Sequence, residues 1–123
     1  MHLPQILREV SRTFAVSIER LPGTLREAVM ISYLLLRVSD CLEDNEVLIV
    51  DRKIELLQLW TEVLLGNAPV EELTRAISHL DASNDPEVYV TQHADELLEA
   101  LTQLPWESQE IILQHVIQST LGM

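Results

Sequence analysis

Polar and charged side chains lie at helical spacing in the first third of the sequence. The positions i, i+4, i+7 and i+11 define one face of a helix, and they are occupied by Tyr33, Arg37, Asp40 and Asp44. Glu43 lies beside this line, three residues after Asp40. Carboxylates suit Mg²⁺, which keeps several waters and is typically shared with a substrate phosphate. An arginine one turn earlier suits a diphosphate, so the face indicates a site for both.

The two aspartates are unfavourable where they stand. As like charges at i, i+4, Asp40 and Asp44 cost about 0.2–0.5 kcal/mol in an isolated helix. Carboxylates in a last turn also face the negative end of the helix dipole, at roughly 0.3–1 kcal/mol when exposed. A bound divalent cation would cancel both costs. The spacing alone leaves a second interpretation open, in which Arg37 pairs with Asp40 or a neighbouring helix, Tyr33 is a core aromatic and the acidic end is merely solvated.

The helix that carries this face is predicted to be buried. Its segment from Ala28 to Leu36 is apolar nearly all round, which is typical of a helix enclosed on most sides. We expect it to open with a capping box of Thr24 and Glu27 and to end near Asp44, with Asn45 as its C-terminal cap.

The remaining sequence is also helical, and strand signals are absent. A first helix is expected from about Pro4 to Glu19, broken near Ser11, before a stop at Leu21-Pro22-Gly23. Four more are expected at Asp51 to Leu65, Val70 to Leu80, Glu87 to Leu104, and from Pro105 to the end. The fold class is all-α, and residues 1–123 form a single helical domain with the motif-bearing helices at about 4–45.

Charge and composition exclude several classes of protein. Twenty acidic residues against eight basic ones give a net charge of −12, which excludes a basic nucleic-acid face and an anionic membrane as the main partner. The longest apolar run is too short for a transmembrane segment, while peripheral membrane contact is left open. Cys41 is the only cysteine and no signal peptide is visible, so we expect a cytoplasmic location.

Several motifs occur in an order and spacing that resemble the squalene/phytoene synthase family of head-to-head prenyl synthases. They are Ser11-Arg-Thr-Phe14, Leu21-Pro22, Arg26-Glu-Ala-Val29 and the segment from Tyr33 to Asp44. Beyond Val50 the resemblance is loose.

The resemblance implies an isoprenoid-synthase fold around one deep apolar cavity, with this chain as its N-terminal half. It implies condensation of two prenyl diphosphates, farnesyl or geranylgeranyl, with Mg²⁺ as cofactor and with NADPH only where squalene is formed. Carried over by position, the Mg²⁺ ligands are Asp40, Glu43 and Asp44, and the catalytic residues are Tyr33, Asp40 and Asp44. The prenyl diphosphate would be bound by Ser11, Arg12, Thr13, Phe14, Tyr33 and Arg37.

A second acidic motif, which the family requires across the cavity, is not found. Asp81 to Asp85 has a similar spacing but is interpreted as a solvated loop, and Asp95 with Glu99 as a solvated helix face. We therefore expect the isolated chain to need a second chain or a C-terminal half for activity. The alternatives are a non-catalytic helical interaction or assembly module of the same superfamily, or a remnant. The sequence does not decide the product or the prenyl chain length.

Overall fold

The computed structural model describes residues 3–122; the side chains of residues 12–14 and 24 lie outside the described residues. Over this range the chain is an all-α bundle without strands. Its elements are α1 (Leu3–Val10), α2 (Arg12–Glu19), α3 (Gly23–Asp44), α4 (Val50–Leu64), α5 (Val70–Ala76), α6 (Pro86–Gln92), α7 (Ala94–Thr102) and α8 (Trp106–Leu121).

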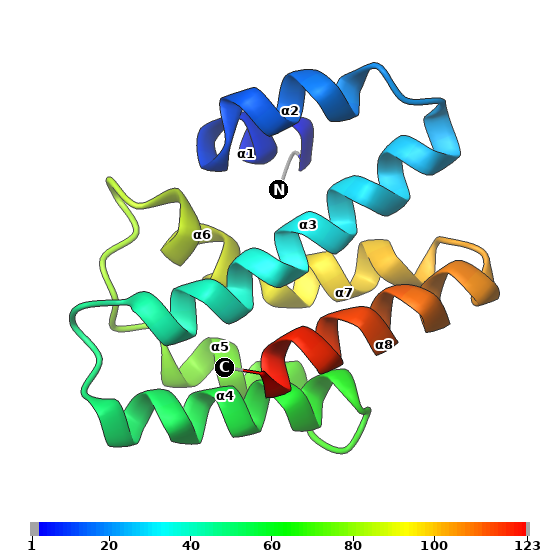
Figure 1. The fold of residues 1–123 in the computed structure, drawn as a ribbon. Coiled ribbons are helices and arrows are strands. Elements are labelled where there is room, and N and C mark those ends of the chain that lie inside the picture. The colour runs from blue at the N-terminus through cyan, green and yellow to red at the C-terminus, as the bar shows by residue number, and fades with distance from the viewer. Residues whose placement is uncertain (1–2, 123) are drawn as a thin grey trace.

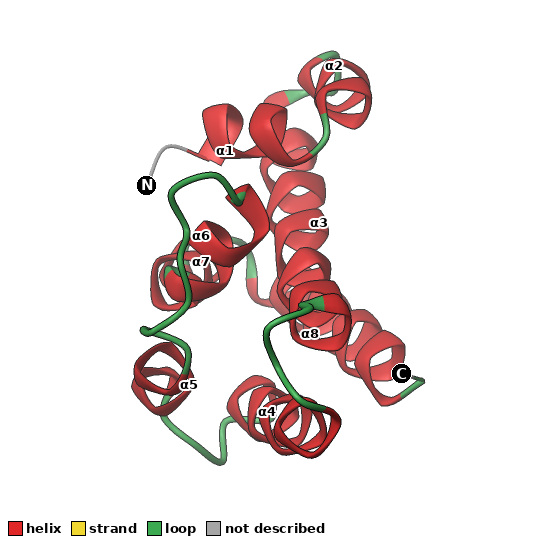
Figure 2. Cartoon of the chain, turned by 90° about the vertical axis from the view of Figure 1, so that its left-hand side faces the viewer, coloured by secondary structure: helices red, strands yellow, loops and turns green. Residues whose placement is uncertain are grey.

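Helix α3 is the centre of the bundle. It packs against α1, α2, α4, α6, α7 and α8 and runs diagonally through the molecule, with α1 and α2 over one end and α4 and α5 beyond the other (Figure 1). In Figure 2, α1 and α2 lie at the upper end of α3, and α4, α5, α6 and α7 lie to its left. Buried residues on its successive turns include Ile31, Leu34, Leu35, Val38 and Leu42. The prediction of a helix buried on most sides is confirmed by these residues. Its remaining side, with Ala28, Val29, Ser32, Tyr33 and Leu36, is only half-buried and borders a hollow.

The predicted C-terminal end of α3 is confirmed, whereas the predicted N-terminal end is not. Asn45 is its C-terminal cap, and the Asn45 N–H donates to the Cys41 carbonyl at 2.9 Å. The predicted capping box of Thr24 and Glu27 is wrong, because the helix begins at Gly23 with Pro22 in the N-cap position. Pro22 has an extended ψ of 150° and accepts the first helical hydrogen bond, from the Arg26 N–H at 2.7 Å.

The helix predicted from Glu87 to Leu104 is divided in two at His93. This residue leaves the helical region at φ −113°, ψ 26°. Its ring stacks on Tyr89, with centroids 4.1 Å apart, and its Nδ1 donates to the Tyr89 carbonyl at 2.7 Å. The same Tyr89 carbonyl also accepts from the His93 N–H at 3.2 Å, so it receives both hydrogen bonds at the break. The Gln92 amide meanwhile donates to two carbonyls of the turn after α5, at 3.1 and 2.8 Å.

A buried chain of hydrogen bonds joins α3, α4 and α8. The Trp60 indole N–H donates to the Ser39 hydroxyl at 2.9 Å, and the Ser39 and Thr120 hydroxyls are 2.7 Å apart. Because the Thr120 hydroxyl donates to the Val116 carbonyl at 2.7 Å, Ser39 is the donor to Thr120. These buried polar groups therefore satisfy one another, and they hold α4 and α8 against the C-terminal half of α3.

Candidate functional site

The C-terminal half of α3 brings together three of the residues singled out in the sequence. The guanidinium carbon of Arg37 lies 6.0 Å from the centre of the Tyr33 ring, and its Nη1 donates to Asp40 Oδ2 at 3.0 Å. Their common origin on one helix explains this, since residues three and four apart are neighbours on its surface. A phenol ring, a guanidinium and a carboxylate thus form one continuous cluster.

The same guanidinium is also held from a second helix. Arg37 Nη2 donates to Glu87 Oε1, which comes from the first turn of α6. The side chains of Arg37, Asp40 and Glu87 are 26, 33 and 31% exposed, so the cluster is half-buried. The Nε atom of Arg37 is buried and has no hydrogen-bond partner among the described residues. Sequence reasoning missed Glu87, because it is separated from Arg37 by 50 positions and no helical spacing connects them.

The remaining carboxylates of the α3 end are open to solvent. Glu43 and Asp44 are exposed, and within the described part of the chain neither makes an ion pair or side-chain hydrogen bond. Residues 3–122 show no group of three or more His, Cys, Asp or Glu side chains arranged to hold a metal ion. Mg²⁺ is usually held by one or two carboxylates together with substrate phosphates, rather than by a full protein cage. Two unpaired carboxylates beside Asp40 fit that shared kind of site.

A polar hollow of about 300 Å³ adjoins this end of α3. Its lining comes from the α3 terminus, the loop that follows and the start of α6: Cys41, Asp44, Asn45, Glu46, Val47, Asp85 and Glu87. The Asp85 carboxylate accepts from the N–H groups of Glu87 and Val88, at 3.1 and 3.2 Å, and so caps α6. The prediction that the 81–85 segment is a solvated loop holds for the exposed Asp81 but not for Asp85, which is half-buried.

A second, smaller hollow lies on the apolar side of the cluster. It measures about 250 Å³ and is lined by Ala28, Val29, Ser32, Tyr33, Leu36 and Ile112. Tyr33 therefore contributes to an apolar hollow while its ring lies near Arg37. An apolar chain and an anionic group could be bound on the two sides of this one residue.

The N-terminal site residues are described only in part. Ser11 is the N-cap of α2 and has extended backbone angles, φ −156° and ψ 95°, between α1 and α2. Its N–H donates to the Leu7 carbonyl of α1 at 2.8 Å, and its own carbonyl accepts from the Ala15 N–H of α2 at 2.9 Å. Its side chain makes no capping hydrogen bond. The predicted break near Ser11 is thus confirmed. The predicted contacts of Arg12, Thr13 and Phe14 lie outside the described residues.

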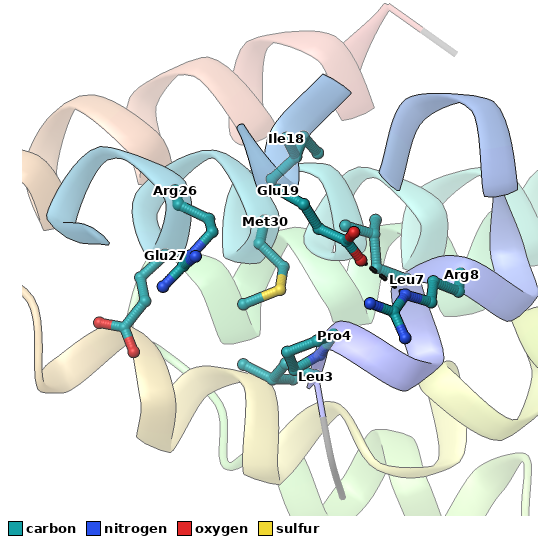
Figure 3. Close-up of a pocket in the computed structure, with 9 residues that line it drawn as sticks. All are labelled: Leu3, Pro4, Leu7, Arg8, Ile18, Glu19, Arg26, Glu27 and Met30. Carbon is teal, nitrogen blue, oxygen red and sulfur yellow. Dashed lines mark hydrogen bonds and ion pairs between the residues drawn. The ribbon is translucent and has the colours of Figure 1, made fainter. Parts of the chain in front are cut away.

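A hollow larger than the two near Arg37 lies elsewhere among the described residues. It measures about 600 Å³ between α1, α2 and the first turns of α3, over a floor that includes Leu7, Ile18 and Met30 (Figure 3). An ion pair between Arg8 Nε and Glu19 Oε1, 2.6 Å long, links α1 to α2 at this hollow. It shares no lining residue with the two hollows near Arg37.

The all-α architecture and the acidic end of its central helix define an isoprenoid-synthase-like bundle. The chain belongs to the squalene/phytoene synthase family, whose model matches residues 7–123. It is 50% identical over 54 residues to squalene synthase of Schizosaccharomyces pombe, a stretch covering 44% of this chain and 12% of that protein.

Other relatives give the same picture. The identity is 47% over 51 residues to squalene synthase of Homo sapiens, covering 42% of this chain and 12% of that protein. It is 46% over 58 residues to squalene synthase BSS of Botryococcus braunii, covering 47% and 13%. The matching stretch therefore spans only 12 to 13% of the length of these relatives. Separately, no helix in residues 3–122 is long and apolar enough to cross a membrane.

Cys41 gives a test of how the α3 end is packed. Its side chain is buried, and burial raises the pKa of the thiol above its ordinary value. The pKa of the thiol is about 8.5 in the unfolded chain and higher in the folded chain. At pH values between the two, the unfolded chain binds fewer protons than the folded chain. Stability should therefore be full below about pH 8.5 and should fall as pH rises through the folded pKa, by up to about 1.4 kcal/mol per pH unit.

The measurement is urea unfolding at several values from pH 7.5 to 10, for the wild type and Cys41→Ala. The wild type is expected to lose more stability over this range than the variant, since the variant retains every other titrating group. Equal losses in both proteins would show that the thiol is not protected as the structure indicates.

Proposed function

We propose that this chain supplies the diphosphate-binding side of the active site in a Mg²⁺-dependent prenyltransferase of the squalene/phytoene synthase type. The observation that carries the proposal is the position of Arg37. It lies between the acidic end of α3 and the apolar hollow at Tyr33, as a site for an apolar chain with a diphosphate head requires.

The residues present suit the ion that this reaction would use. In this proposal Mg²⁺ would be held by Asp40, Glu43 and Asp44 and shared with the diphosphate. When bound, the ion neutralises charge that develops on the leaving diphosphate. Arg37 donates hydrogen bonds to the phosphate oxygens, as its planar group is suited to do.

The apolar side would receive the prenyl chain. Tyr33 and its apolar neighbours would enclose the carbon next to the diphosphate and keep water away from the cation formed there. Tyr33 is proposed to lie near that cation or its proton transfers. Ser11, Arg12, Thr13 and Phe14 are proposed to complete the contacts to the diphosphate from α2.

The proposal covers half of a two-substrate site. Head-to-head condensation of two farnesyl or geranylgeranyl diphosphates requires a second acidic motif, which we expect from a C-terminal half or a second chain. NADPH would enter only where the product is squalene. A cytoplasmic location is part of this proposal and is supported by the single cysteine of the chain.

Calorimetric titration with three probes tests the proposal: farnesyl diphosphate, inorganic pyrophosphate and farnesol, each with Mg²⁺ and with EDTA. Farnesyl diphosphate should bind more tightly than pyrophosphate, both only with Mg²⁺, and farnesol should not bind measurably. Equal binding of farnesyl diphosphate in EDTA would contradict the proposed site. If no probe binds and a protein partner does, the non-catalytic interaction or assembly module becomes the better account.

A further inference from the structure

Among the described residues of the Arg37 cluster, Glu87 comes from a different helix than Tyr33, Arg37 and Asp40. The Glu87 carboxylate accepts a hydrogen bond from Arg37 Nη2, while Asp40 accepts one from Arg37 Nη1. The cluster therefore combines one positive charge with two negative ones, and all three side chains are about one-third exposed or less. A charge balance of −1 is unusual for a group that would receive an anion.

The position of Glu87 is fixed by its own helix. Pro86 opens α6, and the Asp85 side chain accepts from the Glu87 N–H, so the main chain there is set by a proline and a cap. Contacts between α3 and α6 hold the two helices together. The Glu87 carboxylate is thus delivered to Arg37 by packed secondary structure rather than by a free loop.

We propose that Glu87 is a positioning residue that sets how tightly Arg37 binds a diphosphate. It orients the guanidinium between α3 and α6, and its carboxylate competes with phosphate oxygens for the same N–H donors. The diphosphate as ligand rests on the proposed function above. Glu87 holds the arginine ready, and it gives up or shares its hydrogen bond when the diphosphate binds.

Competition follows from the donors that Arg37 has available. A guanidinium has five N–H groups in a rigid fork, and both terminal nitrogens already face carboxylates. Phosphate oxygens that approach either nitrogen meet a like charge. Removing the Glu87 charge while keeping its shape should therefore strengthen anion binding by about tenfold, which is the lower end of the range for one charge-assisted hydrogen bond.

The test compares pyrophosphate affinity in the presence of Mg²⁺ for the wild type, Glu87→Gln, Arg37→Gln and the double variant. Glutamine keeps an oxygen acceptor for Arg37 and removes the charge. The matched control is Glu71→Gln, which removes the same charge from the first turn of α5, a helix of equal length. Urea unfolding of each variant confirms that it folds cooperatively.

The expected result is about tenfold tighter binding by Glu87→Gln, no change in Glu71→Gln, and no gain from Glu87→Gln when Arg37 is also replaced. A merely structural role for Glu87 would weaken binding or leave it unchanged. If Glu87→Gln binds no more tightly while Arg37→Gln still abolishes binding, the inference is overturned and the proposed function stands. If neither the wild type nor Glu87→Gln binds pyrophosphate, the proposed function fails and the inference with it.

Discussion

Replacing Asp40 and Asp44 together with asparagine is expected to abolish Mg²⁺-dependent binding of pyrophosphate and farnesyl diphosphate. Two carboxylates are lost from the end of α3, one beside Arg37 and one unpaired at the polar hollow. Charge-assisted contacts are worth about 1.5–3 kcal/mol each, so affinity should fall by roughly 10² to 10⁴. Calorimetric titration measures the loss directly.

The matched control is Glu71→Gln with Glu72→Gln, which removes two acidic charges from the exposed first turn of α5. This variant changes the net charge from −12 to −10, as the site variant does, so it isolates position from overall charge. Binding should be unchanged in the control. Equal loss in both variants would mean that bulk electrostatics, rather than a site on α3, attracts the ligand.

Replacing Asp44 should weaken ligand binding but raise the free energy of unfolding. Asp44→Asn alone relieves repulsion from the helix dipole and from Asp40, and it should stabilise the fold by up to about 1 kcal/mol in urea unfolding. A residue whose removal stabilises the protein but weakens ligand binding is typical of a functional site.

Replacing Trp60 with alanine is expected to cause the largest loss of stability, about 3–5 kcal/mol from the lost apolar burial and the cavity together. The side chain is 0% exposed, and its N–H is the first donor of the chain through Ser39 and Thr120. Truncation would also leave the Ser39 oxygen without that donor. Because domains of this size are commonly stable by only about 5–15 kcal/mol, the variant should unfold at much lower urea concentration.

Two further variants separate packing from hydrogen bonding. Trp60→Phe keeps much of the apolar volume and removes the indole N–H, so we expect an intermediate loss of about 1–3 kcal/mol. Trp106 is 67% exposed, and Trp106→Ala should change stability by no more than about 0.5 kcal/mol. A loss at Trp106 as large as that at Trp60 would contradict the described core.

The features predicted correctly from the sequence are those encoded by neighbouring residues. The apolar run of Ala28 to Leu36 indicated that α3 is central, and the spacing of Tyr33, Arg37 and Asp40 indicated that they share a face. Helix periodicity needs no knowledge of the partner, so a single stretch of sequence is sufficient for it.

The features that were missed depend on competition or on distant contacts. Pro22 rather than Thr24 is the N-cap of α3. The extended ψ of this proline places the start of the helix two residues before the position that the side-chain motif indicated. The break at His93 was not indicated by the sequence, and the contact of Glu87 with Arg37 depends on the packing of α6 on α3. Arg37 and Glu87 are 50 positions apart, so their contact has no periodic signature in the sequence.

The central claim is that the acidic end of α3 and Arg37 bind a prenyl diphosphate through Mg²⁺. It is tested most directly by thermal unfolding of the wild type with farnesyl diphosphate, with Mg²⁺, with both and with neither. The account predicts a cooperative melt that shifts upward only when both are present, by about 2.7 kcal/mol at 100 times the dissociation constant. A cooperative melt that is the same under all four conditions, or that shifts equally without Mg²⁺, would contradict it.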